Sequence, residues 1–271
     1  MPRLTRITIY PLKSFDGLRV ERSSFAPGGG LRNDRRFALV DAHGKFVNGK
    51  RFASLHRLRA TFDDGLSTVT LAADDGGPET FALRAGDAAL ARWCAVRLGT
   101  EATLAEDVET GFPDDLQSPG PTLISTATIR RVGRWFDLDD DEVRRRFRAN
   151  LEIDDDAAGD CPAFWEDRLF AADAAPDARD VVAFRIGDVR LEGVNPCARC
   201  AVPTRDSLSG EVRERFAFEF GRRRREELPA WAPPSAFDHC YRLAVNTRVP
   251  PNQVGRSIRV GDSIVVGGEP A

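Results

Sequence analysis

Cys197 and Cys200 are the residues of this sequence best suited to chemistry. They flank Ala198 and Arg199, and they directly follow a run that alternates like a β-strand. A cysteine thiolate is a soft, anionic ligand that suits transition metals. The pair therefore predicts that this part of the chain binds something soft.

Two other interpretations of these cysteines stay open from the residues alone. Cys197 and Cys200 have zinc-knuckle spacing, and His239 and Cys240 lie farther along the chain. Adjacent residues of an extended strand point to opposite faces, so His239 and Cys240 could both bind zinc only if the backbone turns there. Cys200 could also be a buried structural thiol, which is what we expect of Cys94 in its helix.

Composition limits the class of protein. The 271 residues suffice for one large or two modest domains, and the net charge of −3 provides no general field for nucleic acid. The amino terminus lacks the apolar core of a signal peptide, and no apolar run is long enough to cross a membrane, so we expect a cytoplasmic protein. The five cysteines are an odd number, which favours reduced thiols over a disulfide framework.

The first half of the chain is rich in predicted strands. They are expected at residues 5–10, 37–40 and 45–47, with a strand pair at 61–72. Residues 41–44 form the turn of a hairpin. The clearest helix covers 88–98, with Asp87 as its N-cap and Gly99 just past its end. The only lysines are Lys13, Lys45 and Lys50, a weak indication that a lysine retained in this arginine-rich chain has a role.

An acidic segment rich in glycine and proline, residues 106–121, predicts the domain boundary. Beyond it we expect helices at about 126–136, from 139 onward and at 214–228, and Gly-Asp hairpins at 182–191 and 258–266. The arginines at 144–146 are expected to be solvated or paired with the acids before them. Those at 222–225 are expected at a solvated helix end, neutralised by Glu226 and Glu227.

Several separate motifs resemble the MOSC-domain proteins, in particular those with an N-terminal MOSC β-barrel domain, such as the amidoxime-reducing component. Tyr10 to Ser14 with Gly17 is similar to the opening motif, and Gly30-Leu31 with residues 34–37 to the second. Residues 147–150 resemble the Phe-Arg-Pro-Asn element, and Glu166-Asp167 an acidic pair that follows it. Cys197 to Cys200 with Thr204, Asp206 and Gly210 resembles the Cys-x-Arg-Cys signature, and residues 258–262 the closing strand.

The resemblance covers essentially the whole chain and implies a mainly β fold with peripheral helices. It implies an N-terminal barrel-like domain at residues 1–110 and a C-terminal MOSC β-barrel at 121–268, with the cofactor between them. The implied cofactor is the molybdenum cofactor, a molybdopterin whose molybdenum is bound by the thiolate of Cys200. A nearby arginine would favour ionisation of that thiol. Pyridoxal phosphate binding is a property given to the family in general, and the resemblance assigns no residue of this chain to it.

The resemblance also assigns the remaining site residues. It gives Lys13, Ser14 and Arg35 to the phosphate and pterin of the cofactor, and Arg148 and Asn150 to the pterin or the pocket near the metal. Charge-assisted donors are what a phosphate requires. From the residues alone, Arg35 could simply pair with Asp34, and Asn150 could be a helix cap.

The implied activity is that of a molybdenum-dependent oxidoreductase, which reduces N-hydroxylated small molecules such as amidoximes by two electrons. Cys94, Cys161 and Cys240 lack iron-sulfur spacing, so a separate reductase or ferredoxin-like partner is expected to supply the electrons. Water or a carboxylic acid such as Asp206 could supply protons. A molybdopterin carrier without turnover is the alternative, ahead of the zinc-stabilised module.

The chain departs from the family pattern at several positions. Asn48-Gly49-Lys50 replaces a Thr-Gln-Arg or Thr-Ala-Arg run, and Ala149 replaces a proline. Arg205 is expected to add a positive charge near the substrate entrance. Residues 171–179 resemble an inserted loop. These differences bear on the substrate more than on the cofactor.

Overall fold

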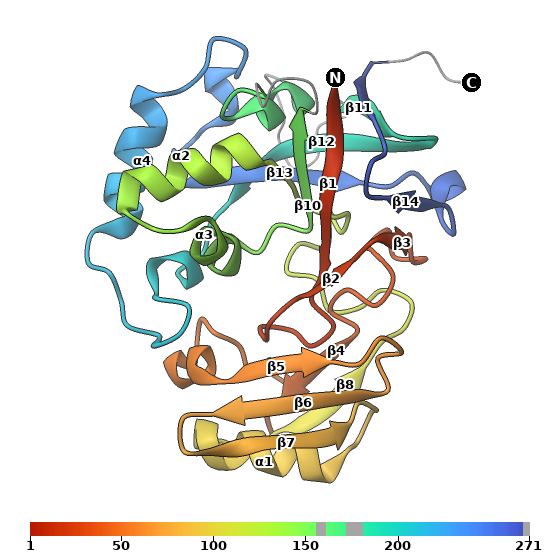
Figure 1. Cartoon of the computed structure of the whole chain (residues 1–271), viewed down its shortest axis with the longest axis vertical. Coiled ribbons are helices and arrows are strands. Elements are labelled where there is room, and N and C mark those ends of the chain that lie inside the picture. Colours follow the sequence, from red (N-terminus) through yellow and green to blue (C-terminus); the bar gives the residue numbers. More distant parts are fainter. Residues whose placement is uncertain (156–160, 172–180, 268–271) are drawn as a thin grey trace.

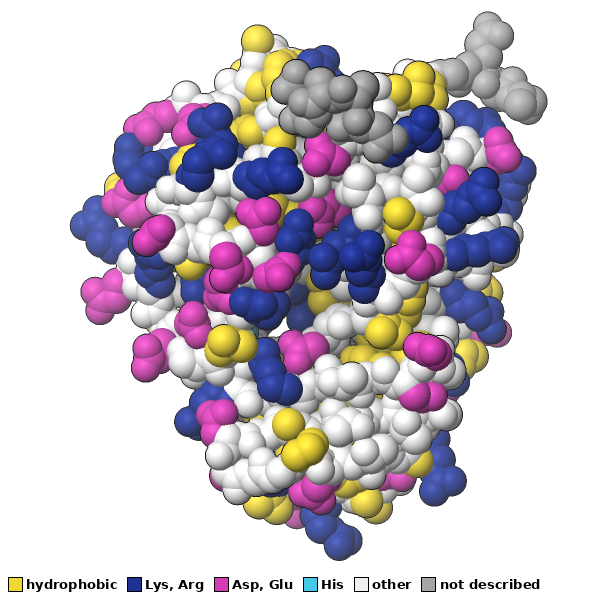
Figure 2. Space-filling view, in the orientation of Figure 1, with side chains coloured by type: hydrophobic (Ala, Val, Ile, Leu, Met, Phe, Trp, Pro, Cys, Tyr) yellow, Lys and Arg dark blue, Asp and Glu magenta, His cyan; other side chains and the backbone are white. Residues whose placement is uncertain are grey.

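The chain folds into a larger and a smaller lobe, both built mainly from β-strands (Figure 1). Figure 2 shows basic and acidic side chains intermixed over the same face of the molecule. The computed structural model describes residues 1–155, 161–171 and 181–267; the inserted loop expected at 171–179 lies almost wholly outside them, as does the last residue of the predicted domain 121–268. The mainly β fold predicted from the sequence is confirmed.

An eight-stranded sheet forms the frame of the larger lobe. Its order is β15 (Ile264–Val266), β11 (Val182–Ile186), β12 (Val189–Ala198), β13 (Arg242–Arg248), β9 (Leu123–Ser125), β10 (Leu151–Asp155), β1 (Pro2–Ile9) and β2 (Leu18–Val20). Only β9 and β10 run parallel. The Leu4 N–H donates to Asp262 O over 2.8 Å and the Gly261 N–H to Leu4 O over 2.7 Å, so the sheet curls until the turn before β15, at one end, contacts β1 near the other end.

The smaller lobe contains most of the first half of the chain. A three-stranded sheet is made by β5 (Arg59–Phe62), β6 (Thr68–Ala73) and β7 (Gly76–Ala82), and a second pair by β4 (Phe37–Val40) and β8 (Thr103–Glu106). Helix α1 (Ala88–Leu98) packs beside them (Figure 1). It confirms the predicted helix, because the Asp87 side chain accepts the Leu90 N–H at 2.9 Å and Gly99 has a left-handed φ of 66°.

Three helices cover one side of the larger lobe (Figure 1). They are α2 (Thr126–Phe136), α3 (Asp140–Phe147) and α4 (Phe216–Glu226), each near its predicted position. Phe136, Phe147, Phe216 and Phe220 bring the three helices together in a buried aromatic cluster. This cluster fixes α3, whose C-terminal end carries the Phe-Arg-Ala-Asn segment into the site.

The two lobes are not formed from two simple halves of the chain. Strand β1 pairs with β10, and β3 (Arg22–Ser24) pairs with β14 (Ser257–Arg259). The first strands therefore belong to sheets completed by the end of the chain. The segment 106–121, where the boundary is predicted, runs between β8 and β9 without helix or strand.

Three details of the sequence-based prediction are wrong. The strand expected at residues 45–47 is reduced to a single bridge between Phe46 and Val40. Residues 258–266 do not form a hairpin, since β14 pairs with β3 whereas β15 pairs with β11. The Gly261-Asp262 turn is used instead to bind Leu4 of β1. Arg224 is not at a solvated helix end: its side chain is 1% exposed, bonds to Asp167 and lies 3.9 Å over the Phe164 ring.

Candidate functional site

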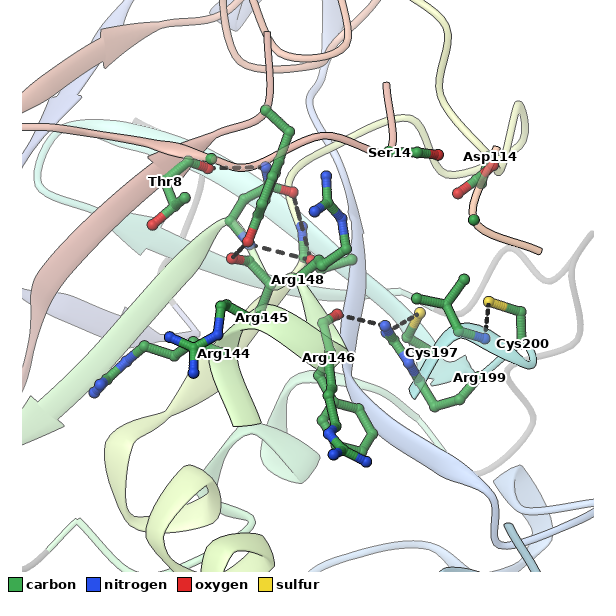
Figure 3. A pocket seen from close by; sticks show the side chains of 18 of the residues that line it. Thr8, Ser14, Asp114, Arg144, Arg145, Arg146, Arg148, Cys197, Arg199 and Cys200 are labelled. Carbon is green, nitrogen blue, oxygen red and sulfur yellow. Dashed lines mark hydrogen bonds between the residues drawn. The ribbon is translucent and has the colours of Figure 1, made fainter. Parts of the chain in front are cut away.

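A cavity of about 610 Å³ lies where the two lobes face each other. It is lined by β1 and the loop after it, the segment 113–120, the end of α3 and the end of β12. Figure 3 shows side chains from these separate parts of the chain converging. All the site residues named from the sequence line this cavity: Lys13, Ser14, Arg35, Arg148, Asn150 and Cys200.

The two cysteines stand at the end of β12 in different environments. Cys200 is half-buried, and its Sγ accepts the Val202 backbone N–H at 3.4 Å. The Arg199 Nη1 donates to Cys197 Sγ at 3.1 Å, and its Nη2 donates to the Phe147 carbonyl (Figure 3). The arginine expected to assist the metal-binding thiol is thus bonded to Cys197. Cys200 keeps its sulfur free of any cationic side-chain donor within the described residues.

Arg148 caps α3 with a left-handed backbone, φ 53°. Its guanidinium lies 4.0 Å over the ring of Tyr10. Within the described residues, its side chain makes no hydrogen bond or ion pair. Burial lowers the pKa of Arg148, and the nearby Arg35 adds to that effect. An anion placed here would therefore find a cation that has no ion-pair partner among the described residues.

Arg35 and Ser14 also have left-handed backbones, with φ of 51° and 73°. The Arg35 guanidinium forms an ion pair with Asp34, as the residues alone suggested. Burial opposes its charge, but Asp34, Asp114 and Tyr10 together outweigh burial, and the pKa of Arg35 is raised. Asp34 also accepts the Tyr10 N–H at 2.7 Å, so it ties Arg35 to the end of β1.

Lys13 is buried and already has polar partners. Its Nζ donates to Phe112 O and to Asp114 Oδ1, each at 2.8 Å. Burial lowers the pKa of Lys13, and Asp114 opposes that change. Burial acts to raise the pKa of Asp114, but Lys13 and Lys50 hold it at about 2. Asp114 is therefore ionised at neutral pH and forms an ion pair with Lys13.

Asn150 is 2% exposed and connects the strands beneath the cavity. Its Nδ2 donates to Thr8 O at 3.1 Å, and its Oδ1 accepts the Thr122 N–H at 3.2 Å. Asn150 thereby joins β1 to the segment before β9 and is more than a helix cap. The side-chain amide of Asn150 lines the cavity, but its hydrogen bonds are made with Thr8 and Thr122.

The sequence did not single out several lining residues: Arg6, Tyr10 and His56. Arg6 carries a buried Nε without a hydrogen-bond partner. His56 Nε2 lies 3.3 Å from Gly49 O, and burial together with Arg205, Arg148 and Arg59 lowers its pKa. The rarity of histidine and lysine was the available signal, and it applies also to Lys50, which lines the cavity within the altered 48–50 run.

Two residues expected near the substrate do not line the cavity. Asp206 accepts the backbone N–H groups of Leu208 and Ser209, and these bonds lower its pKa and favour its ionised form. Arg205 donates to Gly210 O within its own loop at 2.9 Å. Its charge helps to lower the pKa of His56, which lines the cavity.

The described residues contain no cluster of three or more His, Cys, Asp or Glu that could hold a metal ion on protein ligands alone. The side chain of His239 is 50% exposed, whereas Cys240 is 7% exposed. The zinc-stabilised module therefore finds no ligand set in this part of the chain. None of the described helices has the length and apolar character needed to cross a membrane.

Comparison with known proteins assigns the family. The family model of the MOSC N-terminal beta barrel domain matches residues 1–119, and that of the MOSC domain matches 122–265. Molybdenum cofactor sulfurase of Drosophila melanogaster is 24% identical over 242 residues, 78% of this chain and 28% of the relative. Molybdenum cofactor sulfurase of Anopheles gambiae is 34% identical over 103 residues, 36% of this chain and 13% of the relative. The chain thus spans less than a third of the relatives' length, and on the two domain matches it belongs to the MOSC-domain family.

Proposed function

We propose that this protein binds the molybdopterin form of the molybdenum cofactor in the cavity between its lobes, with Cys200 as the metal ligand. The observation that carries the proposal is the convergence of Lys13, Ser14, Arg35, Arg148 and Cys200 on one cavity, although the sequence separates them widely. Clefts between domains are frequent cofactor sites. Pyridoxal phosphate has no place in the proposal.

The chemistry of the lining residues fits such a group. Cys200 offers a half-buried sulfur, which suits molybdenum as a soft ligand. Arg148 offers an unneutralised guanidinium beside an aromatic ring, suited to a flat heterocycle with a phosphate. The buried Arg199 Nε has no hydrogen-bond partner within the described structure. These vacant donors favour an anionic, hydrogen-bonding occupant.

The finer proposal is a two-electron reduction of an N-hydroxylated compound to the amine or imine. The N–O bond breaks: the hydroxyl oxygen takes up one proton and leaves as water, and the nitrogen takes up the second proton. The bound cofactor would supply the two electrons, which a separate reductase or ferredoxin-like protein must replace. The protein's part is to fix the cofactor through Cys200 and to exclude bulk water from the space between the lobes.

A molybdopterin carrier is the second candidate. The relatives are named molybdenum cofactor sulfurase, and this chain matches less than a third of their length. A shared segment of that size supports a common cofactor-binding module. Reduction of a substrate by the bound cofactor and transfer of the cofactor to another protein are therefore two separate proposals.

The decisive experiment is molybdenum and pterin analysis of freshly purified protein. We compare the wild type with Cys200→Ser and with Cys197→Ser as a matched control three positions earlier. We expect molybdenum near one equivalent in the wild type and in Cys197→Ser, and loss of the metal from Cys200→Ser. Equal molybdenum in both variants and the wild type, or none in any of them, would contradict the proposal.

Enzyme and carrier are separated by assaying benzamidoxime reduction with a chemical reductant in place of the partner. Turnover that disappears in Cys200→Ser supports the reductase. Full cofactor content without turnover supports the carrier. Deleting residues 1–115 is a poor substitute, because it removes β1 from its place between β10 and β2.

A further inference from the structure

The side-chain amine of Lys13 forms an ion pair with the carboxylate of Asp114, a residue far along the chain. Asp114 Oδ1 accepts from Lys13 Nζ at 2.8 Å and lies 3.9 Å from Lys50 Nζ. Arg35 is close enough to contribute to the low pKa of the same carboxyl. The carboxylate of Asp114 thus interacts with three positively charged side chains that line the cavity: Lys13, Lys50 and Arg35.

The two partners differ sharply in burial. The Lys13 side chain is 5% exposed, whereas that of Asp114 is 61% exposed. The lysine is fixed inside the protein, and the carboxylate reaches it from the solvent side. Within the described residues, the Asp114 side chain has no other hydrogen bond or ion pair. It can therefore turn outward into water without leaving a buried charge of its own.

A buried ammonium group must be paired with an anion. Asp114 meets this requirement when no ligand does, and a phosphate would meet it equally well with more acceptor oxygens. Figure 3 shows Ser14 and Asp114 at the same end of the cavity, away from Arg144 and Arg145. The carboxylate thus lies at the place where the phosphate of the proposed cofactor would be bound.

We infer that Asp114 is a built-in competitor at an anion subsite formed by Lys13, Lys50 and Arg35, and that a phosphate group must displace its carboxylate to bind. The identity of that phosphate as the cofactor's rests on the proposed function. The competition itself does not, because inorganic phosphate can be used to measure it.

The inference predicts a gain of affinity on removing a charge. Asp114→Asn keeps an oxygen that can accept from Lys13 but no longer neutralises the subsite. The pKa of Asp114 is lowered from 3.8 to about 2, so the surroundings favour its ionised form over its protonated form by a further factor of about 60. Because the side chain is largely exposed, solvent reduces this preference, and we expect about tenfold tighter phosphate binding.

The experiment titrates inorganic phosphate by NMR, at pH 7.5 and constant ionic strength, into the full-length protein prepared from cells that make no molybdenum cofactor, so that the subsite is free. The matched control is Glu109→Gln, an equal charge change at an exposed residue of the same segment. We expect Asp114→Asn to bind phosphate about tenfold more tightly than the wild type, Glu109→Gln to change binding less than twofold, and Lys13→Gln to remove the gain in the double variant. Equal or weaker binding by Asp114→Asn, an equal gain in Glu109→Gln, or no binding by any form overturns the inference.

The two proposals fail in different ways. If Asp114→Asn gains phosphate affinity but the wild type contains no pterin, the competition stands and the proposed function fails. If the wild type contains molybdopterin but Asp114→Asn gains no affinity, the function stands and the competition fails.

Discussion

Glu166 provides the sharpest test of the electrostatics, because its buried carboxyl is only partly satisfied. The residue is 1% exposed and lies in the 3₁₀ turn Trp165–Leu169. Its Oε2 accepts the Ser125 N–H at 3.2 Å and the Thr128 hydroxyl at 3.1 Å, while Oε1 has no hydrogen-bond partner. Burial and the charge of Asp167 raise the pKa of Glu166 to about 7.

The raised pKa makes stability depend on pH with a definite sign. Between the ordinary carboxyl value of 4.5 and about 7 the folded state binds the proton more tightly than the unfolded state. The free energy of unfolding therefore falls as pH rises through this window. From pH 5 to pH 8 the shift corresponds to a loss of about 2–3 kcal/mol, at about 1.4 kcal/mol per pKa unit.

Glu166→Gln removes this titration and keeps the acceptor for Ser125 and Thr128. We expect the variant to match the wild type within about 1 kcal/mol at pH 5 and to exceed it by about 2 kcal/mol at pH 8. The assay is urea unfolding at pH values from 5 to 8. Asp64→Asn, at an exposed carboxylate, is the control and should keep the wild-type slope. A Glu166→Gln curve parallel to the wild type over this range would refute the reasoning.

Two further predictions concern stability. Arg224→Met leaves the carboxylate of Asp167 buried without its partner, so the free energy of unfolding should fall by about 3–5 kcal/mol. The double variant Arg224→Met/Asp167→Leu should regain most of this loss. A double variant as unstable as the single one would contradict the account. Gly210→Ala should destabilise by at least about 1 kcal/mol, because the residue has φ 76° and a Cβ would lie 2.4 Å from Ala53 O. Thermal unfolding compares it with Gly77→Ala, where a Cβ meets nothing within 4 Å, and equal effects in the two would argue against it.

The sequence predicts elements whose signals are local. Helix α1 was found because Asp87 and Gly99 mark its ends and make their contacts within one helical turn. The 258–266 hairpin failed because the same Gly-Asp turn signal serves equally when the flanking strands join different sheets. Pairing partners are non-local, so turn chemistry alone does not identify them.

The residues of the candidate site were likewise predicted only in part. Motifs placed Lys13, Arg148 and Cys200 in one cavity, but they did not reveal Asp114 on Lys13. The acidic 106–121 segment looked like an ordinary linker, and charge runs are usually solvated. Arg224 shows the opposite error, since a run of four arginines concealed one that is buried.

Backbone conformation connects these residues to the proposed function. Ser14, Arg35 and Arg148 all have φ between 51° and 73°, a region that non-glycine residues seldom occupy and that costs about 1 kcal/mol or more each. Arg148 keeps this conformation as the cap of α3, which is held by the aromatic cluster, and Arg35 is held by Asp34. The surrounding fold thus offsets the free-energy cost of three left-handed residues whose side chains all line one cavity. Within the described residues the Arg148 side chain has no hydrogen bond or ion pair, so an anion bound in the cavity, as proposed, would supply the partner that it lacks.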